Sequence, residues 1–180
     1  MKVAEKLPCG LCAEVAGFCL LFLYCLFACQ GPRSTATDSI DQRSYRLGGI
    51  GAFEEMVGAG VKKLALSAAM PKAEMDALFD EAKAIAERNG AEIYLEAEFL
   101  VTDLFPAEIT EGMQVLLIYR GRTLQDYMDL KERKRRLVEG GSYEGGAREE
   151  IARDLGKLLS YPEEKITSLL SRPQKVADGT

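Results

Sequence analysis

The sequence predicts an α/β (α+β) domain with a small three-stranded mixed sheet, a βαβ crossover and C-terminal helices. Residues 92–99 alternate apolar and polar side chains, which is typical of a half-buried strand, and Leu100 and Val101 then make the run fully apolar. Val115 to Tyr119 form a short uninterrupted apolar run, which suits a strand covered on both faces. Between residue 71 and the first of these strands, apolar side chains recur every three to four residues, as in an amphipathic helix.

The composition excludes several classes of chemistry. The chain of 180 residues has no histidine, and its five cysteines all precede Gln30. The rest of the chain therefore has no disulfide, no Cys/His zinc site, no histidine-based triad and no cysteine nucleophile. With 28 acidic and 23 basic residues the net charge is −5, so no global field attracts polyanions and we do not expect nucleic acid as a partner.

Residues 1–29 are predicted to be a signal peptide or membrane anchor. Two lysines precede the uncharged apolar run Val15 to Cys29, which is shorter than the roughly 20 residues of a transmembrane helix. The end of this run, Leu26-Phe27-Ala28-Cys29, resembles a bacterial lipobox, which implies lipidation of Cys29. Three interpretations remain open: a lipoprotein signal, an uncleaved signal anchor or transmembrane helix, and a buried first helix of a cytoplasmic protein.

The segments before the sheet are predicted from their glycines and polar residues. Residues 30–44 have the composition of a linker, and Asp38 to Gly48 is expected to be irregular, with Tyr45 and Leu47 anchored to the core. A short helix is expected over Ala52 to Val57, where apolar residues share one face.

The remaining elements follow in order. We expect a strand at residues 62–67, a helix from Pro71 to Asn89 and then the strand at Ala91. Together they form a βαβ crossover, whose two strands are expected to be parallel. The strand at Val115 is expected to return antiparallel to it. Three C-terminal helices complete a single domain over residues 45–171, and residues 172–180 are expected to be a disordered tail; the helices are predicted at 123–138, 147–159 and 162–170.

Polar residues near the strand ends form one candidate ligand or metal site. Ligands bind at strand ends of open α/β sheets, and carboxylate oxygens suit a divalent cation. The candidates follow the central strand, occupy its loop or follow the returning strand: Asp103, Glu108, Glu111, Arg120 and Arg122. The alternative is that Asp103 only caps the loop and that the two glutamates are solvated.

A cluster of cations on the first C-terminal helix is the second candidate site. It comprises Lys131, Arg133, Lys134, Arg135 and Arg136. Such a cluster can meet RNA or lipid phosphates. We favour a solvated helix face with intrahelical ion pairs, because aromatic residues for base stacking are not interleaved with these cations.

Two segments resemble an uncharacterised, largely archaeal prokaryotic family, a domain of unknown function. They are VTDLFP at Val101 to Pro106 and DLGKLLSYPEEKI at Asp154 to Ile166. In that family a leucine-rich helix runs into a Gly-Tyr-Pro turn; here Ser160 stands at the glycine, and Glu164 at a position where members often have cysteine. The resemblance implies no activity.

The sequence leads to two hypotheses about function. The first is a membrane-tethered binding domain without catalysis, which contacts an unknown protein partner through its sheet edge or its basic helix. The alternative is a cytoplasmic α/β enzyme or ligand binder with the acidic strand-end site, working with or without a divalent metal. The sequence identifies no cofactor and leaves catalysis undecided.

Overall fold

The computed structural model describes residues 41–105 and 110–171. The predicted leader and lipidation site at Cys29, the tail and Glu108 lie outside the described residues.

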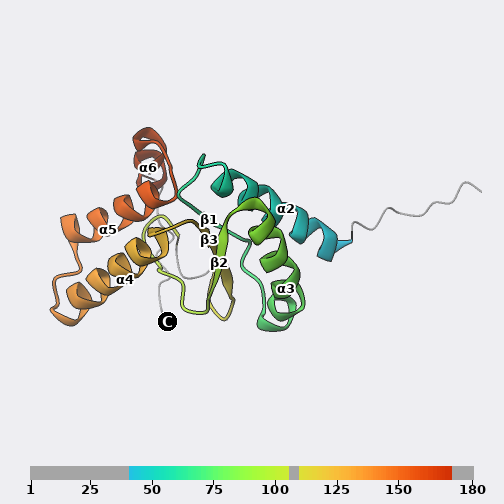
Figure 1. Cartoon of the computed structure of the whole chain (residues 1–180). Coiled ribbons are helices and arrows are strands. Elements are labelled where there is room, and N and C mark those ends of the chain that lie inside the picture. The colour runs from blue at the N-terminus through green and yellow to red at the C-terminus, as the bar shows by residue number, and fades with distance from the viewer. Residues whose placement is uncertain (1–40, 106–109, 172–180) are drawn as a thin grey trace, which may run out of the picture. The chain divides into compact units, whose positions relative to one another are not determined.

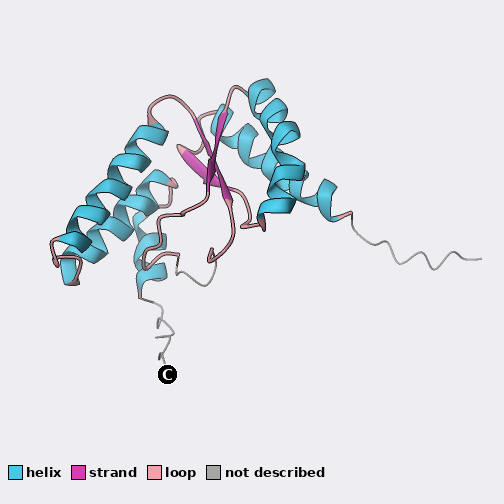
Figure 2. Cartoon of the chain, turned by 90° about the horizontal axis from the view of Figure 1, so that it is seen from below, coloured by secondary structure: helices cyan, strands magenta, loops and turns pink. Residues whose placement is uncertain are grey.

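Three strands lie between two layers of helices (Figures 1 and 2). One layer covers one face of the sheet and consists of α2 (Gln42–Gly58) and α3 (Lys72–Asn89). The other face is covered by α4 (Thr123–Glu139), α5 (Gly145–Leu158) and α6 (Glu163–Leu170). The predicted α+β class and the C-terminal helices are confirmed.

The sheet has the order β1-β3-β2, with β3 in the centre. Its strands are β1 (Leu64–Leu66), β2 (Glu92–Glu96) and β3 (Val115–Tyr119). The antiparallel pairing of β2 with β3 is confirmed, but the mixed sheet is wrong, because β3 also pairs antiparallel with β1. β1 and β2, which α3 connects in the chain, run in the same direction but do not pair, because β3 lies between them. β3 is buried along its whole length, and a central strand is the place where such an apolar run is covered on both sides.

Alternate side chains of β3 supply the two halves of the core. Leu116 and Ile118 pack with residues of α2 and α3, whereas Leu117 and Tyr119 pack with residues of α4, α5 and α6. The period of two along a strand therefore divides one apolar segment between two separate clusters.

α2 differs most from its prediction, because it begins at Gln42 and runs through Gly48, Gly49 and Gly51. The Asp41 carboxylate caps it by accepting hydrogen bonds from the backbone N–H groups of Arg43 and Ser44, at 3.2 and 3.3 Å. Packing of an apolar face on α3 and the sheet outweighs the low helix propensity of the glycines.

Only one of the two residues expected to anchor this segment does so. Leu47 is buried as predicted, but Tyr45 is 67% exposed. The reason is helical geometry, since Tyr45 lies two residues from Leu47 and therefore points to the opposite side of α2.

The turn after α5 is tied to the start of β1. Ser160 has a φ of 60°, in the left-handed region that favours glycine, and it is also the residue at the glycine position of the family resemblance. Its Oγ accepts a hydrogen bond from the Lys63 N–H at 2.9 Å, and Lys62 Nζ donates to the Leu159 carbonyl at 2.7 Å. These bonds fix the turn and offset the strained backbone.

Candidate binding surface at the edge of the sheet

β2 is an edge strand whose outer side pairs with no strand among residues 41–105 and 110–171. Ile93 and Leu95 turn toward the cluster under α2 and α3, while Tyr94 is 38% exposed. An unpaired strand edge presents backbone N–H and C=O groups at regular spacing, which is a template for an added strand.

Three side chains of α4 hold the segment that follows β2. The Leu100 N–H donates to the Tyr127 hydroxyl at 3.0 Å. Lys131 Nζ donates to the Glu98 carbonyl at 2.5 Å, and Lys134 Nζ to the Val101 carbonyl at 2.7 Å. Residues 98–101 are therefore held next to α4 without belonging to a strand.

Glu96 at the end of β2 is a buried carboxylate with a cation beside it. Its side chain is 5% exposed, and each of its carboxylate oxygens lies 3.1 Å from Lys131 Nζ. One oxygen also accepts from the Glu98 N–H at 2.8 Å. Burial, with a smaller contribution from Glu96, raises the pKa of the fully buried Tyr127 above its ordinary value, so the phenol stays protonated.

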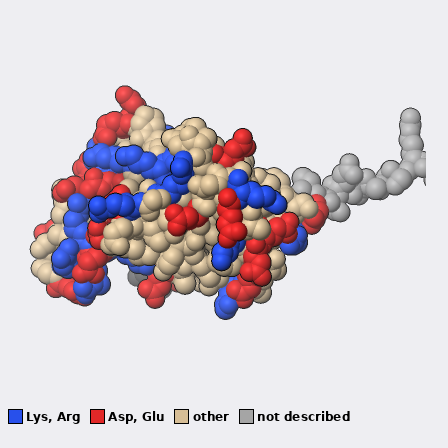
Figure 3. All heavy atoms as spheres, in the orientation of Figure 1, with Lys and Arg blue, Asp and Glu red and all other residues tan. Residues whose placement is uncertain are grey.

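An open groove of about 730 Å³ continues from the end of β2, between residues 98–101 and α4. Its apolar lining includes Phe99, Met128 and Val138, the last 53% exposed. In Figure 3 charged side chains gather mainly at the two sides of the visible face, whereas the surface between them is largely uncharged with a few acidic side chains. The strand edge and the groove thus form one continuous surface.

The cations of the predicted polyanion site are all engaged within the domain. Lys131 and Lys134 bind the segment after β2, and burial lowers the pKa of Lys134. The three arginines pair with carboxylates: Arg133 with Asp154, Arg135 with Glu132 and Glu139, and Arg136 with Glu132. The structure places the five on one helix but divides their contacts among different neighbours.

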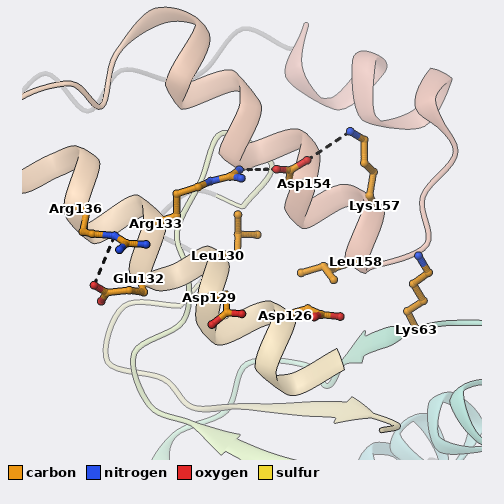
Figure 4. A pocket seen from close by; sticks show the side chains of 10 residues that line it. All are labelled: Lys63, Asp126, Asp129, Leu130, Glu132, Arg133, Arg136, Asp154, Lys157 and Leu158. Atoms are coloured by element: carbon orange, nitrogen blue, oxygen red, sulfur yellow. Dashed lines mark hydrogen bonds and ion pairs between the residues drawn. The ribbon is translucent and has the colours of Figure 1, made fainter. Parts of the chain in front are cut away.

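A second hollow, of about 600 Å³, lies between α4 and α5 (Figure 4). Arg133 reaches from α4 to Asp154 on α5, and Lys157 approaches the same carboxylate at 3.4 Å. Four acidic and four basic side chains line this hollow, so its charges offset one another and it favours no ligand of a single sign.

The residues of the predicted strand-end site do not form one group. Asp103 pairs with Arg148 of α5, at 2.8 Å from Arg148 Nε to each carboxylate oxygen. Arg120 instead follows β3, and its guanidinium donates to the Gly58 carbonyl at 2.5 Å. The register sets Tyr119 against Glu92, at the end of the sheet opposite to Asp103.

The other members of that set are exposed or lie outside the described residues. Glu111 and Arg122 are both exposed, on opposite sides of β3 in the chain. Within residues 41–105 and 110–171, no group of three or more acidic side chains is placed to hold a metal ion. The antiparallel return of β3, which the sequence also predicted, carries Arg120 and Arg122 to the other end of the sheet, so grouping them with Asp103 was not consistent with that pairing.

The sequence analysis missed the most unusual titratable residue, Glu54. It is fully buried on the inner side of α2, and neither carboxylate oxygen has a hydrogen-bond partner among the described residues. Burial raises its pKa from 4.5 to about 7, although Arg88 of α3 lowers it in part. Helical spacing does place Glu54 between Ile50 and Val57 on the apolar face, which is the signal that points to it.

Comparison with known proteins adds no relative. The chain matches no family model, no curated protein and no solved structure. The resemblance to an archaeal family stays a prediction.

The described part of the chain contains no helix that is long and apolar enough to cross a membrane. The predictions of a membrane or lipoprotein location concern residues 1–29, which lie outside it.

Proposed function

We propose that this protein is a non-catalytic binding domain, held at a membrane by its N-terminal segment, that takes an extended segment of a partner protein along β2. The observation that carries the proposal is the unpaired outer edge of β2, which leads directly into an apolar groove. Strand addition gives affinity through main-chain hydrogen bonds, and pockets beside the strand give specificity.

The side chains at this edge define the chemistry of the partner segment. Glu92 and Glu98 are exposed, whereas the Glu96 carboxylate is already neutralised by Lys131. The partner segment is therefore expected to carry basic residues along β2. An apolar side chain beyond them fits the groove next to Val138.

This proposal explains why residues 98–101 are held so firmly. Hydrogen bonds from Lys131 and Lys134 and to Tyr127 fix the groove wall before any partner arrives. A preformed wall reduces the conformational entropy that binding has to overcome. In this proposal the buried Tyr127 hydroxyl and the buried Glu96 carboxylate hold the wall of the groove in place.

We do not propose the strand-end site as the function. Asp103 is engaged by Arg148, and Arg120 is engaged at the other end of the sheet. An enzyme or metal-dependent ligand binder has no comparable arrangement in its favour among the described residues.

Selection of peptides from a random 12-residue display library on the full-length protein in detergent micelles tests the binding mode. Selected peptides are expected to be basic with one apolar anchor and to slow hydrogen exchange of the β2 backbone amides. Protection confined to α4 and α5, with none in β2, contradicts the proposal.

Two matched pairs of variants sharpen this test. Tyr94→Lys places a cation on the edge strand and is expected to weaken peptide binding at least about tenfold, because it opposes a basic strand. Met113→Lys, at similar exposure but off the edge, is the control. Val138→Glu is expected to weaken binding through the groove, whereas Val61→Glu, exposed outside the groove, leaves binding unchanged.

The membrane part of the proposal has its own test. The intact mass of the protein from separated membrane and soluble fractions is expected to show either lipid on Cys29 or a full-length membrane-bound chain. A full-length protein found only in the soluble fraction contradicts the tether and leaves the binding mode intact.

A further inference from the structure

The hydrogen bonds of the central strand β3 determine which backbone groups of β2 face outward. Leu116 faces β1, because its carbonyl accepts from the Ser67 N–H at 3.0 Å and its own N–H donates to the Ser67 hydroxyl at 2.9 Å. Successive residues of a strand direct their backbone groups to opposite edges. The backbone groups of Val115, Leu117 and Tyr119 therefore face β2.

The register of β2 leaves two of its residues with backbone groups on the outer edge. Glu92, Tyr94 and Glu96 pair with the three residues of β3 that face them, so their N–H and C=O groups are used inside the sheet. The N–H and C=O groups of Ile93 and Leu95 therefore point away from β3. Among the described residues, no other element donates to or accepts from the backbone of these two. The edge thus offers two donors and two acceptors, on residues about 7 Å apart.

The same alternation assigns a face to each side chain of an added strand. Residues directly opposite each other in a sheet turn their side chains to the same face, as Tyr94 does with Leu117, which packs with residues of α4, α5 and α6. A partner residue opposite Tyr94 or Glu92 therefore lies on the α4 face, which is also the face of the groove. Glu92 is an exposed carboxylate and Tyr94 an exposed ring, and both attract a lysine or arginine.

We propose that the partner segment runs antiparallel to β2 and carries an apolar residue, a basic residue four positions later and a second basic residue two positions after that. The basic residues lie opposite Tyr94 and Glu92, and the apolar residue reaches the groove, which begins at Glu98. The position opposite Glu96 needs no cation, because Lys131 already pairs with that carboxylate. This inference rests on the proposed binding function and adds the direction and the register of the partner.

The antiparallel direction follows from the sheet that the partner extends. Both existing pairings are antiparallel, and an antiparallel ladder is slightly more stable per residue than a parallel one. In such a ladder Ile93 and Leu95 each exchange two hydrogen bonds with one partner residue. Because β2 runs toward the groove, an antiparallel partner enters at the groove, and its apolar residue precedes its basic residues.

A second copy of β2 suits this edge less well than a basic segment does. An antiparallel pair centred on Tyr94 sets Glu92 opposite Glu96 of the partner subunit, on the same face of the sheet. Carboxylates directly opposite each other destabilise a sheet, and this pairing supplies no cation to Glu92. A basic segment supplies one.

Three blocked nine-residue peptides, added to the full-length protein in detergent micelles, test the proposal. The first has leucine at its second position and lysine at its sixth and eighth, with serine and threonine elsewhere. The second has the reversed order, which places the same side chains only in a parallel ladder. The third has its lysines at the fifth and seventh positions, which turns them to the other face. We expect NMR titration to show that the first binds at least about tenfold more tightly than the others.

Amide exchange and spin labels report the register and the direction. The first peptide is expected to slow exchange of the Ile93 and Leu95 amides at least about tenfold, because they gain hydrogen bonds. It is expected to leave the Tyr94 amide, which already bonds to β3, unchanged. A nitroxide at the N-terminus of the peptide is expected to broaden the signal of Val138, and one at its C-terminus that of Glu92.

A matched pair of variants tests the charge at the end of the edge. Glu92→Gln is expected to weaken binding of the first peptide about threefold, since it removes one exposed ion pair. The loss is expected to disappear in about 1 M salt, where such a pair is screened. Glu87→Gln makes the same change at an exposed position of α3 and is expected to leave binding unchanged.

The outcomes that overturn this inference differ from those that overturn the proposed function. Equal or tighter binding of the reversed peptide, or spin-label broadening in the opposite sense, contradicts the antiparallel direction. A first peptide that does not slow exchange at Ile93 and Leu95 contradicts the register. Library peptides that still slow exchange in β2 then leave the binding function intact, whereas the failure of every peptide to do so contradicts both.

Discussion

The two helical layers of this domain differ in how their buried carboxylates are satisfied. In the layer of α4, α5 and α6, buried or half-buried ions have partners: Glu96 meets Lys131, and Arg133 meets Asp154. In the layer of α2 and α3, the fully buried Glu54 has no hydrogen-bond partner among the described residues, although two arginines of α2 pair with glutamates of α3. The buried carboxylate of the first layer therefore has a cation beside it, whereas the buried carboxylate of the second layer makes no hydrogen bond to a described residue.

This difference indicates where each layer contributes. The paired charges of α4 hold the segment after β2 and so build a fixed wall for a binding groove. In the layer of α2 and α3 the buried Glu54 instead makes stability depend on pH. Four substitutions test the contrast, ordered from the largest expected effect to the smallest.

Removal of Lys131 is expected to have the largest effect. Lys131→Met leaves the buried Glu96 carboxylate without its cation and the Glu98 carbonyl without a donor. We expect the free energy of unfolding to fall by about 3 to 4 kcal/mol, since breaking one side of a buried ion pair strands the other charge. Urea denaturation measures the change.

A double variant isolates the stranded charge. Lys131→Met combined with Glu96→Met is expected to recover most of the lost stability, because two apolar groups then pack together. A single variant as stable as the wild type would contradict this. It would show that the ion pair between Glu96 and Lys131 does not stabilise the fold.

The next effect concerns Glu54 and depends on pH. The folded pKa of about 7 lies above the unfolded value of 4.5, so the folded state holds the proton more tightly than the unfolded state. The contribution of Glu54 to the free energy of unfolding is therefore fully present below pH 4.5. The free energy of unfolding falls by about 3 kcal/mol as the pH rises through 7. Above that range Glu54 causes no further change.

Glu54→Gln removes the titration and supplies the test. The variant is expected to exceed the wild type by about 3 kcal/mol at pH 8 and to equal it near pH 4. Thermal unfolding at several pH values measures the difference. Equal pH dependence in both proteins shows that Glu54 has a partner in solution, with Arg88 of α3 the nearest candidate.

A smaller loss is expected from Gly58→Ala. The new methyl group meets the Asn89 carbonyl oxygen of α3, a backbone atom that moves only with its helix. We expect a loss of about 2 kcal/mol from overpacking, measured by urea denaturation. Gly48→Ala, which meets nothing within 4 Å, is expected to stabilise slightly and serves as the matched control.

The smallest effect is expected from Arg135→Ala. Arg135 pairs with Glu132 and Glu139 on the exposed side of α4, where solvent screens the attraction. We expect no resolvable change in the melting temperature. A clear loss would show that exposed ion pairs, and not only Lys131, hold this layer together.

Much of the secondary structure follows from local pattern. The helix stripe of α3, the ending of that helix at Gly90 and the apolar run of β3 all appear at their predicted places. These elements depend on side-chain periodicity and on residues that begin or end helices, both of which are properties of neighbours in the chain. Only the part of α2 over Ala52 to Val57 was predicted, because the glycines before it weaken the local signal while distant packing stabilises the whole helix.

The candidate site was predicted only in part, for a related reason. That the strand near Ala91 is an edge strand depends on β3 inserting between β1 and β2, a choice among pairings that are all compatible with the sequence pattern. The five cations of α4 were visible as a cluster, but their partners lie far away in the chain, such as Glu96, Val101 and Asp154.

The sequence by itself determined the fold class, the position of most helices and strands, and the absence of histidine and cysteine chemistry beyond Gln30. Tertiary structure alone decided the strand order, the engagement of Asp103 by Arg148 and the burial of Glu54 without a hydrogen-bond partner among the described residues. The physical reason is the range of the interactions. Periodicity and helix capping act between neighbours, whereas strand pairing, ion pairing and desolvation depend on residues that only the folded chain brings together.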